Sequence, residues 1–129
     1  MIFVDSNVPM YLIGAPHPNR ERVVEFLRDR PEEEYVTSAE VYQEILHRYV
    51  AIDRRDAASH AFTLLDDLTA RVFDVTRDDV GAAMRHAQRH PGLSARDCLH
   101  LAVMSSHGIQ RVITFDRAFA GVPGVTTLP

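Results

Sequence analysis

The sequence of 129 residues contains no lysine, so all 14 of its basic residues are arginines. An arginine side chain stays charged and cannot serve as a Schiff-base amine or a proton shuttle. Cysteine is almost as scarce: Cys98 is alone, so the chain forms no internal disulfide and no zinc site built on cysteine pairs. These absences exclude enzymes that depend on a catalytic lysine and folds that depend on disulfides or on zinc held by cysteine pairs.

Long apolar runs are absent as well. The uncharged stretches fall well short of the ~18 apolar residues that a membrane helix needs, and Asp5 interrupts the N-terminus before the core of a signal peptide could form. The composition, with 46% hydrophobic and 25% charged residues, is typical of globular proteins. We therefore expect one compact soluble domain over residues 1–129, in the cytoplasm and without membrane contact.

Short β-branched runs alternate along the chain with longer amphipathic segments. Strands are expected at residues 1–4, 35–36, 71–75, 111–115 and 125–128. Helices are expected at residues 9–13 and 19–30, from a cap at Thr37 or Ser38, at 54–68, from Thr76 to a point before Pro91, and at 95–106. This alternation predicts an α/β fold, a three-layer α/β/α sandwich with a mainly parallel central sheet.

Four acidic residues fall where such a sheet would gather them. Asp5 and Asp116 follow two strands, Glu44 lies two turns into a helix, and Asp97 lies in the first turn of an apolar helix. Ligands of open parallel sheets collect at the carboxyl ends of the strands. Carboxylates that meet there repel each other unless a hard divalent cation neutralises them. The pattern therefore predicts a Mg²⁺ or Mn²⁺ site that activates water for phosphodiester hydrolysis.

Each of these acids also has a purely structural interpretation. Asp5 and Asp116 suit turns or helix caps, and Asp97 fits a loose capping box with Ser94. Glu44 lies four residues before Arg48, the spacing of an ordinary surface ion pair on a helix. Glu40 completes a capping box with Thr37, and we leave it out of the predicted site for that reason.

Two histidine patterns carry less weight. His86 and His90 are four residues apart on one helix face, but no acid stands in a metalloprotease register with them, so metal binding is disfavoured. His100 lies one turn after Asp97, and a buried histidine with satisfied hydrogen bonds is the favoured interpretation. Cys98, on the same apolar helix, is expected in the core.

The segments that carry these acids resemble the PIN-domain family, in order and spacing. They are residues 2–7 (IFVDSN), 37–45 (TSAEVYQEI), 94–102 (SARDCLHLA) and 113–119 (ITFDRAF). Within that family, the length is most like that of VapC-type ribonuclease toxins of toxin–antitoxin pairs. The resemblance implies a metal-binding quartet of Asp5, Glu44, Asp97 and Asp116. It places Ser6, Asn7 and Thr114 beside that quartet, and it implies a homodimer and a cognate antitoxin protein.

Other functions remain open at this level. Receiver domains and haloacid-dehalogenase phosphatases share the architecture, but both are known to require a lysine that this chain lacks. A DNA-directed PIN or flap-type nuclease would use the same metal chemistry, and a non-catalytic PIN-like module would use its acids only to bind a protein. The net charge of −4 predicts weak nonspecific RNA binding, hence a selected RNA, with Arg96 and Arg117 as candidate phosphate contacts.

Overall fold

The computed structural model, which describes residues 1–129, is built on a five-stranded sheet with the order β3-β2-β1-β4-β5, in which every strand pair is parallel. The strands are β1 (Ile2–Val4), β2 (Tyr35–Ser38), β3 (Arg71–Phe73), β4 (Arg111–Ile113) and β5 (Thr126–Leu128). Because β1 is the middle strand, its end lies between the ends of β2 and β4. The predicted α/β class is confirmed, and the sheet is parallel throughout.

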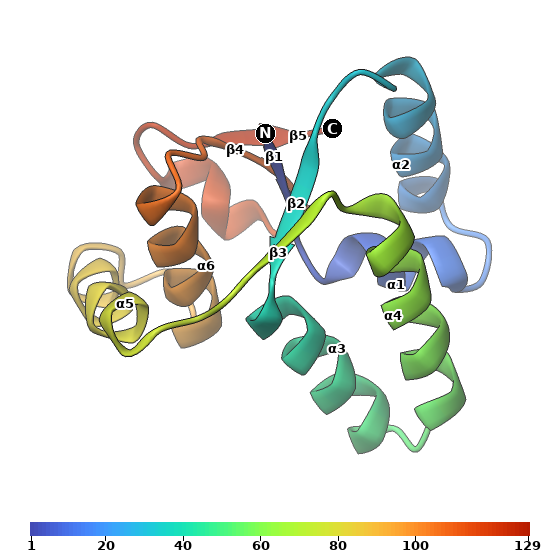
Figure 1. Cartoon of the computed structure of the whole chain (residues 1–129), viewed down its shortest axis with the longest axis horizontal. Coiled ribbons are helices and arrows are strands. Elements are labelled where there is room, and N and C mark those ends of the chain that lie inside the picture. Colours follow the sequence, from blue (N-terminus) through green and yellow to red (C-terminus); the bar gives the residue numbers. More distant parts are fainter.

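Six helices cover the two faces of the sheet (Figure 1). They are α1 (Asn7–Ile13), α2 (Pro18–Asp29), α3 (Ala39–Ala51), α4 (Arg55–Leu68), α5 (Arg77–Arg89) and α6 (Ala95–Ser106), and a 3₁₀ turn spans Arg117–Gly121. The helices α5 and α6 lie together on one side of the sheet, and α1 to α4 lie on the other. The molecule is therefore the predicted three-layer sandwich.

The central strands are buried on both faces, as expected where helices cover a parallel sheet. All three residues of β1, Ile2, Phe3 and Val4, are fully buried and belong to the main core cluster. The helix α6 is apolar around most of its circumference and is the most deeply buried helix, so Asp97 and His100 enter the interior with it. None of the helices has the length and apolar character needed to cross a membrane.

Several element boundaries differ from the sequence prediction. The strand predicted at 111–115 ends at Ile113, the strand predicted at 71–75 ends at Phe73, and α1 begins two residues before Pro9. The strand β2 instead extends to Ser38. Segment ends are set by pairing with neighbouring strands, which local patterns do not contain.

The capping box predicted for Thr37 and Glu40 is wrong. Thr37 is a fully buried strand residue, and its hydroxyl donates to the carbonyl oxygen of Val4 on the neighbouring strand, at 2.9 Å. The cap residue of α3 is Ser38, whose side chain makes no capping bond. Thr37 therefore joins β2 to β1 at the point where both strands approach their carboxyl ends.

Candidate active site

Asp5 lies at the centre of the carboxyl edge of the sheet, directly after β1. Its Oδ1 accepts the backbone N–H of Ser6 at 2.7 Å, and its Oδ2 accepts the hydroxyl of Thr114 at 2.6 Å. The amide of Asn7 donates to the same Oδ2 at 3.4 Å. Three donors thus fix a carboxylate that is almost fully buried. The alternative role of Asp5 as a side-chain cap of α1 is wrong, because its oxygens bond Ser6, Thr114 and Asn7.

Thr114 ties the two halves of the chain together at this edge. Its hydroxyl oxygen accepts the backbone N–H of Asp116 at 3.0 Å and the amide of Asn7 at 3.3 Å, while its proton goes to Asp5. The Oδ1 of Asn7 accepts the N–H of Phe115 at 3.4 Å. The loop after β4 is therefore bonded to the residues that follow β1, and Asp116 is held beside Asp5.

Glu44 on α3 and His100 on α6 approach Asp5 from opposite layers of the sandwich. His100 Nε2 lies 3.1 Å from Glu44 Oε1 and 3.8 Å from Asp5 Oδ1. One ligand atom from each of the three residues lies within 4.8 Å of the other two, a spacing compatible with a shared metal ion. The surface ion pair considered for Glu44 and Arg48 is absent, because Glu44 turns inward to His100.

Asp97 and Asp116 form the other side of the cluster, and Asp116 also caps the 3₁₀ turn that follows it. The N–H of Asp97 donates to Ser94 Oγ at 3.2 Å at the start of α6, and the N–H of Ala118 donates to Asp116 Oδ1 at 2.9 Å. Asp97 lies close enough to Asp116 for that carboxylate to raise its pKa. The cap predicted for Asp116 is therefore confirmed, whereas the loose capping box of Ser94 and Asp97 forms only its Ser94 half, which leaves the carboxylate of Asp97 free of a capping role.

The electrostatics of the cluster show an excess of negative charge. Burial and the neighbouring Asp116 raise the pKa of Asp97 to about 6. Burial also raises the pKa of Asp5, against the opposing effects of His100 and Thr114. Burial is the largest single effect on Glu44 and disfavours its charged form, but the bond and charge of His100, together with Ser6 and Arg96, outweigh burial and lower the pKa of Glu44. Carboxylates that repel one another in this way are suited to bind a hard divalent cation, which prefers oxygen ligands.

The pKa of His100 is raised, although burial alone would lower it. The bond to Glu44 and the nearby charges of Asp5 and Asp97 favour the protonated ring. His100 is fully buried, and its Nδ1 has no hydrogen-bond partner. The expectation of a buried histidine is confirmed, but its hydrogen bonds are not all satisfied, and the polar contacts that it makes are to the acids. From the sequence, the position of His100 one helical turn after Asp97 allows a place near the site, but the structural interpretation is favoured over it.

Glu40 and the two candidate arginines surround the cluster. Glu40 pairs with Arg96, with Arg96 Nε 3.9 Å from Glu40 Oε1, so the charge of Arg96 is already shared with an acid. Arg117 is exposed and lines a hollow of about 270 Å³ together with Arg22, Thr114 and Asp116. Of the two arginines, Arg117 has the more open position beside the acids.

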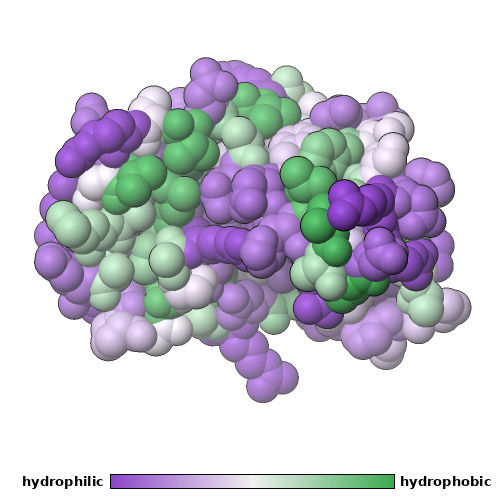
Figure 2. Space-filling view, turned by 90° about the horizontal axis from the view of Figure 1, so that it is seen from below, coloured by the Kyte–Doolittle hydropathy of each residue, from purple (hydrophilic) through white to green (hydrophobic).

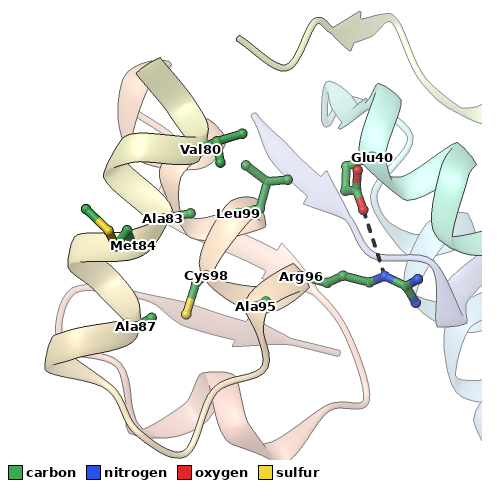
Figure 3. A pocket seen from close by; sticks show the side chains of 9 residues that line it. All are labelled: Glu40, Val80, Ala83, Met84, Ala87, Ala95, Arg96, Cys98 and Leu99. Carbon is green, nitrogen blue, oxygen red and sulfur yellow. Dashed lines mark ion pairs between the residues drawn. The ribbon is translucent and has the colours of Figure 1, made fainter. Parts of the chain in front are cut away.

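Apolar surface flanks the acidic centre. Figure 2 looks onto the carboxyl ends of the strands and shows a hydrophilic middle between two hydrophobic patches, one over the α5 side and one over the α3 side. On the first side a groove of about 350 Å³ runs between α5 and α6, lined by Val80, Met84, Leu99 and neighbouring residues (Figure 3). The Arg96–Glu40 pair lies at one end of this groove (Figure 3).

The histidine pair on α5 does not join this site. The rings of His86 and His90 stack with their centroids 6.3 Å apart, and neither residue belongs to the cluster of potential metal ligands. Cys98 is fully buried in a small apolar cluster with Ala83 and Ala102, as its position in the sequence predicts.

The fold and the site together define a class of protein: parallel α/β/α sandwiches with an acidic centre at the end of the middle strand. Comparison with known families shows which family of this class the chain belongs to. The family model for the PIN domain matches residues 2–125. The chain therefore belongs to the PIN-domain family.

Within that family, the chain groups with the VapC ribonucleases. It is 47% identical to Ribonuclease VapC13 of Mycobacterium tuberculosis over 131 aligned positions, which cover 99% of each chain. It is 45% identical to Ribonuclease VapC23 of the same species, over 93% of this chain and 96% of the relative. Among solved structures, the sarcin–ricin-loop-cleaving toxin VapC20 of M. tuberculosis superposes with a TM-score of 0.78, at 26% identity, covering 97% of this chain and 98% of that one.

Proposed function

We propose that this protein is an endoribonuclease that hydrolyses selected RNA phosphodiesters with the help of bound Mg²⁺ or Mn²⁺. The observation that carries the proposal is the convergence of four acids from four separate segments on one edge of the sheet. No arginine forms an ion pair with Asp5, Glu44, Asp97 or Asp116, and burial and mutual repulsion raise the pKa of Asp97 to about 6. A persistent cluster of this kind is suited to a divalent cation.

The residues divide into those that would hold the metal and those that hold these ligands in place. We assign Asp5 and Asp97 as primary ligands, with Asp116 and Glu44 completing the set directly or through water. A bound divalent cation supplies a lowered pKa of coordinated water and stabilisation of the leaving oxygen. The N–H of Ser6, the amide of Asn7 and the hydroxyl of Thr114 fix the orientation of Asp5.

RNA binding would rely on few positive groups, because the chain carries a net charge of −4. Arg117 is exposed in the hollow that also contains Asp116, where it would meet a phosphate next to the scissile one. Arg96 lies nearer the other side of the site and would have to exchange Glu40 for a phosphate. Because affinity for the phosphate backbone depends on basic surface, we expect recognition of a structured RNA rather than broad degradation.

The proposal includes protein partners and a cellular location. The VapC names of the relatives and the apolar patches beside the acidic centre support binding of a small cognate antitoxin protein. Exposed apolar side chains such as Val80 and Met84 are 54% and 62% exposed, and a homodimer or the antitoxin would cover surface of this kind. An RNA substrate of this kind places the activity in the cytoplasm.

The test is cleavage of total RNA from the host by the purified protein. We expect discrete fragments with Mg²⁺ or Mn²⁺, and no fragments with EDTA or with the Asp97→Asn variant, which also controls for contaminating nucleases. The Asp97→Asn substitution keeps the backbone N–H that Ser94 caps. Cleavage of DNA in preference to RNA would favour the DNA-directed alternative, and metal binding without any cleavage would favour a protein-binding module.

A further inference from the structure

His100 is a buried polar residue that the proposed chemistry does not yet use. It lies on α6, one turn after Asp97, and its side chain is 1% exposed. Its Nε2 faces two carboxylates, Glu44 Oε1 at 3.1 Å and Asp5 Oδ1 at 3.8 Å. An N–H at Nε2 is therefore directed between the two acids that come from α3 and from the end of β1.

The remainder of the ring is held by packing. Phe3 on β1 lies against it, with the ring centroids 5.6 Å apart and the planes tilted by 46°. Nδ1 has no hydrogen-bond partner. A buried histidine that served only the fold would be expected to satisfy both nitrogens, whereas here every polar contact of the ring goes to the acidic cluster.

We propose that His100 is a positioning residue that donates Nε2–H to Glu44 and holds this carboxylate beside Asp5, ready for a divalent cation. The inference rests on the proposed function. Glu44 needs such a partner because its long side chain is 22% exposed, and because Asp5 repels it. A donor placed between two carboxylates allows both to remain in the geometry that a metal requires.

The alternative is that His100 is itself a metal ligand. A ligating histidine almost always donates its other ring N–H to a protein acceptor, which fixes the ring and strengthens it as a ligand. Nδ1 of His100 has no such acceptor. The surroundings of the ring therefore favour a role that acts through Glu44.

Three variants separate these roles. In His100→Gln the side-chain amide reaches the position of Nε2 and keeps the donor. In His100→Asn the amide reaches only the position of Nδ1, where there is no partner. His100→Leu has no donor and retains much of the apolar contact with Phe3. The measurements are Mn²⁺ and Mg²⁺ affinity by calorimetry, without RNA, and the kcat and KM of RNA cleavage.

For His100→Leu and His100→Asn we expect the affinity for both metals to fall about 10- to 100-fold, as is typical when the partner of a metal ligand is removed. The ratio of Mn²⁺ to Mg²⁺ affinity should stay the same. The loss in cleavage should appear in kcat at limiting metal and not in the KM for RNA. His100→Gln should recover metal affinity to within about 3-fold of the native protein. Should leucine prevent folding, the contrast between Gln and Asn still tests the proposal.

Two results would overturn it. Native metal affinity in both His100→Leu and His100→Asn would reduce His100 to a packing residue. A selective loss of Mn²⁺ affinity that Gln does not restore would make it a ligand, because imidazole nitrogen favours transition metals over Mg²⁺. Failure of the proposed ribonuclease function is distinguishable, since it would leave the native protein without RNA cleavage while the calorimetric comparison still holds.

Discussion

Acidic residues lie both where the strands of the sheet begin (the amino edge) and where they end (the carboxyl edge), but their charge partners differ. At the amino edge, Arg111 binds both carboxylate oxygens of Glu33, at 2.7 and 2.8 Å, and Arg71 Nη2 lies 3.2 Å from Glu34 Oε1. Both arginines begin strands, and both acids precede β2. At the carboxyl edge, Asp5 and Glu44 face each other and a histidine, and Arg96 is paired with Glu40 outside the cluster.

The difference indicates that charge interactions stabilise the fold at the amino edge and destabilise it at the carboxyl edge. Paired charges at the amino edge lower the pKa of Glu33 and favour the folded state. At the carboxyl edge, a single arginine in the cluster would relieve the repulsion, yet none is present. Clusters of like charge without a cationic partner are expected at functional sites, where charges are arranged for a ligand rather than for the stability of the fold. Variants that change one edge at a time test this contrast.

The largest effect is expected from Asp97→Asn, which should act with opposite sign on activity and on stability. Cleavage should fall by at least about 100-fold because a primary ligand is lost. In EDTA, the variant should be more stable than the native protein, on the order of 1 kcal/mol, because repulsion with Asp116 and Asp5 is removed. Urea unfolding measures the second effect. The exposed Asp67 on α4 supplies the control, since Asp67→Asn should change neither quantity, and a destabilised Asp97→Asn would contradict the argument.

Binding of a divalent metal should relieve the repulsion between the carboxylates at the carboxyl edge and so stabilise the folded protein. Mg²⁺ or Mn²⁺ at 100 times its dissociation constant should stabilise the native protein by about 2.7 kcal/mol, read as a rise in the unfolding midpoint. Asp97→Asn should show little of this rise. An equal rise in both proteins would place the metal elsewhere.

Thr114→Val should separate support of the site from the ligands themselves. Valine keeps the size of threonine but removes the hydroxyl that donates to Asp5 and accepts from the Asp116 N–H. Cleavage should fall about 10-fold, with recovery in Thr114→Ser. Thr126→Val, an exposed change on β5, is the matched control. Full activity in Thr114→Val would show that the hydroxyl does not orient Asp5.

The smallest effect belongs to the amino edge. Glu33→Gln should lower stability slightly at neutral pH and leave cleavage unchanged, because it breaks a pair remote from the acids. The pKa of Glu33 is lowered in the folded state, so its stabilisation is present above the ordinary value of 4.5 and is lost as the pH falls through the lowered value. Unfolding midpoints of the two proteins should therefore converge in acid. A difference that persists there would mean that the pair acts through packing.

Much of the fold was accessible from the sequence because its signals are local. The apolar run of residues 2–4 and the acid after it predict a buried strand and its end, and α6 shows its burial in its own composition. Contacts between distant residues were not accessible. The sequence around Thr37 predicts a helix cap, because the bond of Thr37 to Val4 on the neighbouring strand cannot be predicted locally. Likewise, the partner of Glu44 is His100, 56 residues away, rather than Arg48. The roles of the acids stay predictions until the variants are measured.

The bond between Thr114 and Asp5 joins residues 109 positions apart. Ribosomes make Asp5 first and Thr114 and Asp116 near the end of these 129 residues. A nascent chain therefore carries the early acids for most of its synthesis without the residues that orient and complete them. The acidic centre can therefore be assembled only after β4 takes its place beside β1, which makes it one of the last parts of the molecule to form during synthesis.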